Sequence, residues 1–218
     1  LAGVIMISTS SSIDKANIAK AKVFEESVMN DLAANMTFRW TFDEGSGVDV
    51  GDVWNSNNGT LVNFSSPPTL TSGWVIKENN CVSGKCLKFD GVDDYIPNYL
   101  SPPTTSTTIG FWVKRNNNII GREQFCWLWN DGGIIGLNNK KLYIYDGANY
   151  QTINFDVADN KWHYIARVDY RVPEDLVFYI DGREWGRYES KIFYGANLHY
   201  WGTAYNKTDY FYKGFMDD

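Results

Sequence analysis

Residues 36–42, Met-Thr-Phe-Arg-Trp-Thr-Phe, alternate apolar and polar side chains without interruption. Such alternation places the apolar side chains on one face of an extended strand. The stretch leads directly into Asp43-Glu44-Gly45-Ser46-Gly47, a run of residues that favours turns. The sequence therefore predicts that a β domain begins near residue 36.

The residues before this point have the period of a helix. Residues 13–32 contain no Gly or Pro and are rich in Ala, Lys and Glu, whereas the serines and threonine at 8–12 are poorer helix formers. Apolar residues at helical spacing form one stripe, made of Ile18, Ala21, Phe24, Val28 and Leu32. We therefore predict an amphipathic helix over 13–32, packed against the β domain or a neighbouring subunit, and divide the chain into 1–35 and 36–218.

The rest of the chain consists of short alternating runs separated by turn signals. Asp-Gly pairs at 90–91, 146–147 and 181–182 are typical of hairpins. About a dozen such strands without a second helix predict a mainly β protein, an antiparallel β-sandwich of the jelly-roll type. The net charge of −6 argues against a surface that binds nucleic acid.

The cysteines suggest one local disulfide. Cys81 and Cys86 are separated by Val-Ser-Gly-Lys, which allows the chain to turn back, so in an exported protein they could be bridged; the alternative is two reduced thiols. The absence of a Cys-x-x-Cys motif and of a His cluster argues against zinc. Cys126 lies in an apolar run and is interpreted as a buried free thiol.

The β region resembles the laminin-G-like, concanavalin A-like jelly-roll family. The resemblance rests on short motifs in the family's order: WTFDEGSG at 40–47, NGTLVN at 58–63, LKFDGVDDYI at 87–96, FWVK at 111–114, DNKWHY at 159–164, YIDG at 179–182 and KGFMDD at 213–218. It implies a final strand beyond Asp218, beside the first one, that this sequence leaves out.

The N-terminal region resembles the rear of a type IV pilin or pseudopilin helix. Residues 1–7, Leu-Ala-Gly-Val-Ile-Met-Ile, are similar to the end of its apolar half, and residues 18–32 to its amphipathic half. Seven residues cannot span a bilayer, which needs about 20. We expect membrane contact only through an apolar segment upstream of residue 1. The resemblance implies pilin-like partners and a place on a filament of a bacterial cell envelope.

The jelly-roll resemblance also implies a possible calcium ion. Its ligands would be Asp43, Asp52, Asn55 and Asp217, since hard cations take oxygen ligands. Glu44, Asp93 and Asp94 are further candidates. The alternative interpretation is that these residues form turns or lie on the surface.

The sequence gives little support for catalysis. Glycoside hydrolases need paired carboxylates beside a cleft, and their Glu-x-Asp-x-x-Glu arrangement is absent. Asp181, Glu184 and Glu189 surround a hairpin turn, where charged residues are expected in any case. His163 and His199 lack a nucleophile motif and are interpreted as solvated or locally bonded. We expect no enzyme.

Tryptophans could form a platform on which sugars stack. The candidates are Trp127, Trp129, Trp185 and Trp201; core or rim packing is the alternative for each. Alternation assigns Trp40 and Trp162 to the core.

Two main functions remain after the sequence analysis. One is a non-enzymatic, pilin-like subunit of a cell-surface filament whose jelly roll binds a surface glycan or protein. The other is a free-standing or anchored carbohydrate-binding module, with a glycan-active hydrolase as a weaker alternative. The fold alone does not separate them.

Overall fold

The computed structural model describes residues 2–65, 71–75, 80–100, 106–118, 121–128, 133–145, 149–171, 174–189, 198–204 and 206–218, with side chains of the N-terminal helix from residue 12 onward. Helix α1 spans Ala2–Leu32, and a 3-10 turn, η1, spans Ala33–Asn35. The helix is therefore longer than predicted, because the Ser-rich stretch at 8–12 is helical too. Within the described residues, no helix is both long and apolar enough to cross a membrane.

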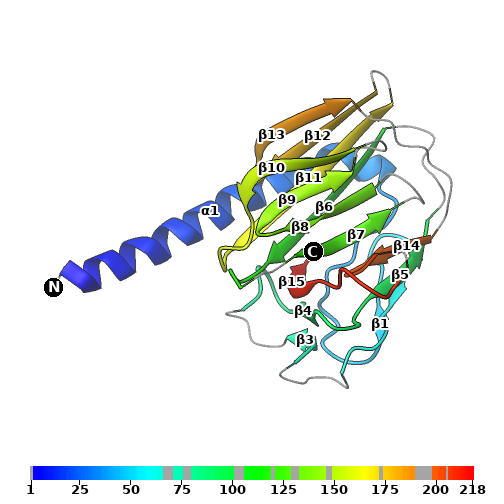
Figure 1. Cartoon of the computed structure of the whole chain (residues 1–218), viewed down its shortest axis with the longest axis horizontal. Coiled ribbons are helices and arrows are strands. Elements are labelled where there is room, and N and C mark those ends of the chain that lie inside the picture. The colour runs from blue at the N-terminus through cyan, green and yellow to red at the C-terminus, as the bar shows by residue number, and fades with distance from the viewer. Residues whose placement is uncertain are drawn as a thin grey trace.

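Two antiparallel sheets make up most of the β region (Figure 1). The seven-stranded sheet has the order β13-β12-β11-β6-β15-β4-β3. Its strands are β3 (Gly73–Val75), β4 (Cys86–Asp90), β6 (Thr107–Lys114), β11 (Trp162–Arg171), β12 (Glu174–Ile180), β13 (Arg183–Glu189) and β15 (Lys213–Asp217).

The six-stranded sheet has the order β10-β9-β8-β7-β14-β5. Its strands are β5 (Ile96–Tyr99), β7 (Arg122–Leu128), β8 (Gly133–Asn138), β9 (Lys141–Tyr145), β10 (Tyr150–Asp156) and β14 (Leu198–Trp201). A small ribbon pairs β1 (Asp49–Val50) with β2 (Gly59–Thr60). The predicted antiparallel β-sandwich with one N-terminal helix is confirmed.

The main core lies between the two sheets and is rich in aromatic rings. Phe111 on β6 meets Phe125 on β7 edge to face, with ring centroids 6.0 Å apart. Trp201 on β14 packs against Phe111 and Trp40 at 5.5 and 5.9 Å. These contacts join strands of both sheets, so burying the rings holds the sandwich together.

For residues 36–42, the alternation predicts the burial correctly, but the predicted strand does not form. Trp40 and Phe42 are buried, as the alternation predicts. The stretch makes only an isolated bridge between Trp40 and Asp52 instead of a ladder. One cause is that the Arg39 N–H donates to the carboxylate of Asp52 at 2.9 Å rather than to a neighbouring strand. Phe42 also has a φ of +52°, outside the extended region.

The three Asp-Gly pairs differ in what they join. The pair at 181–182 connects β12 to β13 in a hairpin, with Ile180 opposite Arg183. β9 and β10 also pair, with Tyr145 opposite Tyr150, although residues 146–148 lie outside the described part of the chain. The hairpin prediction for 90–91 is wrong, because β4 and β5 belong to different sheets.

Strand β11 is buried on both faces. Trp162, Tyr164 and Ala166 are buried on the outer face, in a cluster with Ala21 of α1. Trp162 is therefore buried as predicted, but beneath the helix rather than inside the sandwich. The face that looks polar in the sequence, with His163 and Arg167, points between the sheets: Ile165 on the same face belongs to the main core.

Helix α1 lies against the outer face of the seven-stranded sheet, and its N-terminal part projects away from the strands (Figure 1). Phe24 contacts the rings of Tyr164 and Tyr179 at 6.1 and 5.5 Å. Ala21 is fully buried and Ile18 packs beside it, in agreement with the predicted stripe. Val28 is half-buried. Leu32 is 38% exposed, because the helix ends there and the chain turns toward the first β residues.

We expect Phe24→Asp to detach α1 while leaving the sandwich folded. A carboxylate among Tyr164 and Tyr179 loses their packing and is poorly solvated there, at a cost of about 2–3 kcal/mol. Hydrogen exchange should show faster exchange in residues 13–32 and unchanged protection in β6 and β11. Val23→Asp is the control, because Val23 is 67% exposed on the same helix. Equal protection of α1 in both variants would contradict the prediction.

Candidate functional site

A row of mostly aromatic side chains crosses the outer face of the six-stranded sheet. We call it the aromatic row; it consists of Tyr150, Tyr145, Ile134, Trp127 and Tyr200, on five strands. The register places Tyr150 opposite Tyr145, Trp127 opposite Ile134, and Tyr200 opposite Trp127. Cross-strand neighbours of this kind stand side by side on one face. Helix α1 packs on the other sheet, so it does not cover the row.

The β10 end of the row is its open end. Tyr150 is 51% exposed, and its ring lies 5.0 Å from that of Tyr145 and 5.8 Å from that of Tyr143. The exposed Arg122 places its guanidinium carbon 4.8 Å from the ring centre of Tyr150 and 5.6 Å from that of Tyr143. A cation over aromatic faces is held by the ring quadrupole. This end therefore presents a tyrosine face with a fixed positive charge.

A glycine makes room for this arrangement. Gly136 lies between Gln124 and Tyr143 in the register of β7, β8 and β9. A Cβ at Gly136 would stand 2.8 Å from the Tyr143 ring and 2.3 Å from a backbone oxygen of residue 123. The missing side chain lets the Tyr143 ring lie close to the sheet, beneath Arg122.

The β14 end has a second cation. Tyr200 packs against Trp127 at 5.9 Å and against Tyr95 at 6.0 Å. The ammonium of Lys207 stands 5.4 Å from the centre of the Tyr200 ring. Tyr200 is only 6% exposed, however, so a tyrosine ring beside a basic side chain is accessible at the β10 end alone among the described residues.

The predicted tryptophan platform is only partly found here. Trp127 belongs to the row but is 6% exposed, so it forms the floor. Trp201 is a core residue, because it is on the inward face of β14. Trp185 packs on Phe155 at the edge of the core. Trp129 lies outside the described residues.

The sequence analysis missed the tyrosines. Tyr143 and Tyr145 alternate with Leu142 and Ile144, so their outward position was available from the pattern. What could not be seen was the register that brings Tyr200 and Tyr150 onto the same row.

The predicted calcium ligands near the first strand have other partners. The Asp52 carboxylate accepts hydrogen bonds from the N–H groups of Arg39, Trp54 and Asn57 at 2.9–3.0 Å. Burial raises the pKa of Asp52, but these bonds outweigh it and lower the pKa. The Asn55 amide donates to the carbonyl oxygens of residues 36 and 37 at 3.2 and 2.9 Å.

The other two ligands are also engaged. Asp43 accepts from the Lys85 N–H at 2.8 Å, and the Lys85 ammonium lies 2.8 Å from the Asp43 carbonyl oxygen. Asp217 is buried and accepts from the N–H groups of Val82 and Ser83 at 2.8 and 3.2 Å. With an ammonium beside Asp43 and backbone donors on the other carboxylates, these residues do not fit a calcium ion in the arrangement described. Calcium binding stays a prediction.

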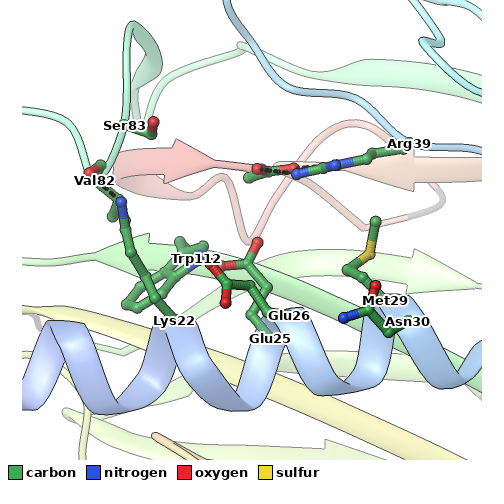
Figure 2. Close-up of a pocket in the computed structure, with 10 residues that line it drawn as sticks. Lys22, Glu25, Glu26, Met29, Asn30, Arg39, Val82, Ser83 and Trp112 are labelled. Carbon is green, nitrogen blue, oxygen red and sulfur yellow. Dashed lines mark hydrogen bonds and ion pairs between the residues drawn. The ribbon is translucent and has the colours of Figure 1, made fainter.

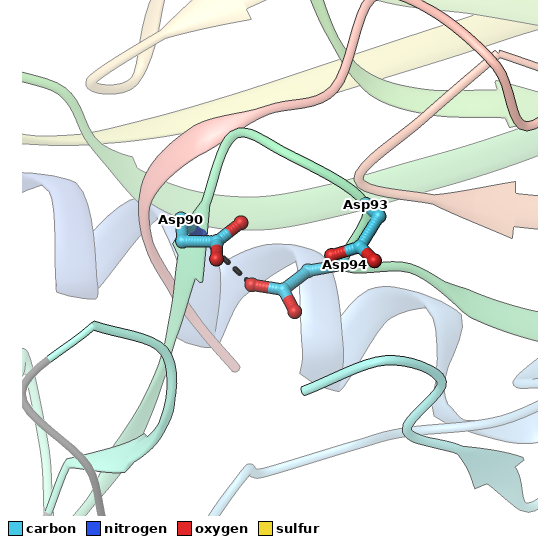
Figure 3. Close-up of side chains that lie close together, drawn as sticks. All are labelled: Asp90, Asp93 and Asp94. Atoms are coloured by element: carbon cyan, nitrogen blue, oxygen red, sulfur yellow. Dashed lines mark hydrogen bonds between the residues drawn. The ribbon is translucent and has the colours of Figure 1, made fainter. Parts of the chain in front are cut away.

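Within the described residues, the carboxylates close enough to share a metal ion are Asp90, Asp93 and Asp94, with one oxygen of each inside 4.8 Å of the others (Figure 3). Asp90, the last residue of β4, and Asp94 are bonded to each other across the turn that follows this strand. The Asp90 N–H donates to Asp94 and the Val92 N–H donates to Asp90, each at 2.8 Å. Burial raises the pKa of Asp94 to about 7, so its carboxyl is partly protonated at neutral pH. We interpret the cluster as a structural turn.

A pocket of about 440 Å³ lies where α1 crosses the seven-stranded sheet (Figure 2). From the helix, Glu25 accepts a hydrogen bond from the Trp112 indole at 2.9 Å, and Lys22 donates to the Val82 carbonyl at 2.9 Å. Burial raises the pKa of Glu25. On the opposite wall Arg39 binds both carboxylate oxygens of Asp218, at 2.9 and 2.7 Å. The bonds of Glu25 and Lys22 connect the helix to the β domain.

The loop beside this pocket contains the disulfide. Cys81 and Cys86 are bonded, with their Cα atoms 5.5 Å apart. Cys126 is a buried free thiol, as predicted, and burial raises its pKa to about 12.

Of the two expectations for His163, solvated or locally bonded, the structure shows the second. His163 is 6% exposed, and its ring nitrogens contact Asp181 at 2.8 Å and Asp159 at 3.1 Å. Burial lowers the pKa of His163, but the two carboxylates outweigh it and raise the pKa to about 9. Both ring nitrogens are occupied, so the ring has no free nitrogen for acid–base chemistry. Asp181 is committed to this link.

The other residues considered for catalysis are Glu184, Glu189 and His199. Glu184 lies 3.6 Å from the Arg187 guanidinium on β13, and Glu189 is exposed at the end of that strand. His199 is buried, and burial lowers its pKa to about 4, so it is neutral at pH 7.

The link at His163 predicts a pH dependence of stability. A histidine with a pKa near 6.5 when unfolded and about 9 when folded binds its proton more tightly in the folded state. Its contribution is complete below pH ~6.5 and is lost as the pH rises through about 9. Urea denaturation from pH 6 to 10 should show this loss in the wild type. His163→Gln should be less stable at pH 6 and lose less on going to pH 10; parallel pH profiles would contradict the assignment.

No protein-family model matches the chain, and no curated protein matches it. Solved structures do share its fold. Domain 4 of AbnA, a GH43 extracellular arabinanase from Geobacillus stearothermophilus solved with arabinotriose, is 17% identical, with a TM-score of 0.58 over 83% of this chain and 88% of that one. At this identity the similarity shows the fold alone.

Two further solved structures show the same likeness. The receptor-binding domain of botulinum neurotoxin type G is 16% identical, with a TM-score of 0.56 over 84% of this chain. The Trypanosoma rangeli sialidase is 12% identical, with a TM-score of 0.56 over 82% of this chain. The chain spans less than half of their lengths, 45% of the toxin domain and 29% of the sialidase. The protein thus shares the β-sandwich fold of these structures.

Proposed function

We propose that this protein is a non-enzymatic glycan-binding module that acts outside the cell. The observation that carries the proposal is the aromatic row on the outer face of the six-stranded sheet, with Tyr150 and Tyr145 accessible at one end. Aromatic faces bury apolar area without requiring a buried polar partner, which suits the C–H face of a sugar ring.

Three other observations support the proposal. The Cys81–Cys86 disulfide is typical of proteins that fold in an oxidising compartment. Structures with the same fold include a domain solved with arabinotriose and a toxin receptor-binding domain. The candidate carboxylates are occupied by His163 and Arg187, or are exposed, which favours binding over hydrolysis.

The proposal predicts that Tyr150→Ala weakens glycan binding about tenfold, equivalent to ~1.4 kcal/mol. The substitution removes the exposed ring and one of the two supports of Arg122. Binding would be measured by glycan array, followed by calorimetry with the best ligand. Tyr170→Ala is the matched control, because Tyr170 is an exposed tyrosine on the other sheet, 36% accessible. Equal affinities of the two variants, or no glycan bound by the wild type, would refute the proposal.

A second candidate function is a filament subunit, favoured by the helix. The N-terminal part of α1 projects from the body (Figure 1). Where the helix lies on the sheet, its outward side carries apolar Ile13 and Val23, which are 58% and 67% exposed. An exposed apolar side of a long helix suits packing among other helices. In this arrangement the jelly roll would be the displayed, glycan-binding head.

The two candidates can be separated in cells. The gene, with whatever coding sequence lies upstream, would be expressed beside pilus assembly machinery, and filaments would be sheared from the surface. A filament subunit should appear in the sheared fraction and be lost from it in a Val23→Asp variant. Recovery only as a free protein would reject the filament role and leave glycan binding untouched.

A further inference from the structure

We propose that the aromatic row selects acidic glycans, with Arg122 binding a carboxylate of the sugar. This inference rests on the proposed function and adds the class of ligand. It comes from the charges that surround the row rather than from the fold.

Arg122 has an unbalanced positive charge among the described residues. The six strands of the sheet contain two acidic residues, Glu123 and Asp156. Glu123 is engaged by Arg115, whose Nη2 is 2.6 Å from its carboxylate. Asp156 stands opposite Lys141 in the register. This leaves Arg122 with tyrosine rings but no carboxylate in the described part of the chain.

Arg122 is also held in a suitable position. The faces of Tyr143 and Tyr150 restrict its guanidinium, so the N–H groups at its edge remain available. A guanidinium fixed in this way loses little entropy when it makes two parallel hydrogen bonds to a carboxylate. A sugar stacked on Tyr150 would bring a ring carboxylate within its reach.

At the other end of the row the exposed Lys207 stands over Tyr200, whose own ring is buried, so the accessible part of the site is the end with Arg122. The protein as a whole carries a net charge of −6, so a non-specific attraction for polyanions is not expected. The open β10 end of the aromatic row would be a local exception in the surface charge, with the Arg122 cation placed beside the exposed ring of Tyr150. Charge complementarity therefore favours an acidic glycan over a neutral one.

The test uses pairs of ligands that differ only in charge. A short galacturonic acid oligomer is compared with its full methyl ester, and sialyllactose with the methyl ester of its sialic acid, by calorimetry on the whole protein. We expect the acidic member of at least one pair to bind about tenfold tighter or more than its neutral partner. Added sodium chloride should reduce that advantage, because salt screens exposed charges.

Variants assign the effect to Arg122. Arg122→Gln should remove most of the preference for the acidic ligand while keeping binding of the neutral one. Arg183→Gln is the control, since Arg183 also stacks on an aromatic ring, that of Trp185 at 4.9 Å, but on the other sheet. Circular dichroism would confirm that both variants are folded.

The outcomes distinguish the proposed glycan binding from the proposed preference for acidic glycans. If neutral ligands bind as tightly as acidic ones and Tyr150→Ala weakens both, glycan binding stands and the acidic preference is wrong. If the acidic preference persists in Arg122→Gln, the assignment to Arg122 is wrong. If no ligand binds in either pair and the glycan array is also empty, both proposals fail.

Discussion

Trp201→Ala is expected to lower the free energy of unfolding by about 3–5 kcal/mol, the usual cost of removing a large aromatic residue from a packed core. Trp201 is 4% exposed and packs against Trp40, Phe38 and Phe111, so alanine would leave a cavity between the sheets. The substitution also removes the indole N–H that donates to Asn98 at 3.3 Å. The change would be measured by urea denaturation at constant pH.

The control for this prediction is Trp54→Ala. Trp54 is 48% exposed, so its removal should change stability by less than about 0.5 kcal/mol. The comparison also tests the earlier interpretation of Trp201 as a sugar-stacking residue. Normal stability combined with lost glycan binding would show that Trp201 serves a ligand and that the core assignment is wrong.

Arg167→Met is expected to destabilise the protein by about 3–5 kcal/mol, because it leaves a buried carboxylate without its cation. Arg167 is fully buried between the sheets, and two of its nitrogens reach Asp169 at 3.0 and 3.2 Å. Burial raises the pKa of Asp169 by more than the nearby Arg167 lowers it, so the net shift is upward. Without Arg167 the pKa should rise further, so the variant should lose more stability as the pH increases.

A double variant separates the charge from the packing. Arg167→Met combined with Asp169→Leu removes both charges and should recover most of the lost stability, since buried ion pairs can be replaced by apolar residues of similar size. The surface pair of Arg187 and Asp175, at 3.0 Å, is the control: Arg187→Met should leave the stability nearly unchanged, because solvent screens an exposed pair. A double variant as unstable as Arg167→Met would show that the pair is needed for more than charge balance.

The local parts of the structure could be predicted well. The helix stripe of Ile18, Ala21 and Phe24 depends only on the helical repeat, and these residues do face the sheet. Leu32 follows the same period yet is exposed, because the helix stops there. The pairing of Cys81 with Cys86 is similarly local, since both are in one short loop.

The candidate site could be predicted only in part. Trp127 was chosen for its residue type and is in the aromatic row, but Trp201 was chosen for the same reason and is in the core. Residue type cannot distinguish the two faces of a strand. Tyr150, Tyr200 and Arg122 come from three distant segments, and only the order β10-β9-β8-β7-β14-β5 places them on one face.

By itself, the sequence determined the fold class, the position of the helix and which residues share a face of a strand, because periods of 3.6 and 2 follow from backbone geometry. The tertiary structure decided which of those faces is covered. On β11 the face with Trp162 and Tyr164 lies under α1, while the face with His163 and Arg167 is enclosed between the sheets. The physical reason is that burial depends on partners far away in the chain, and a local pattern carries no information about them.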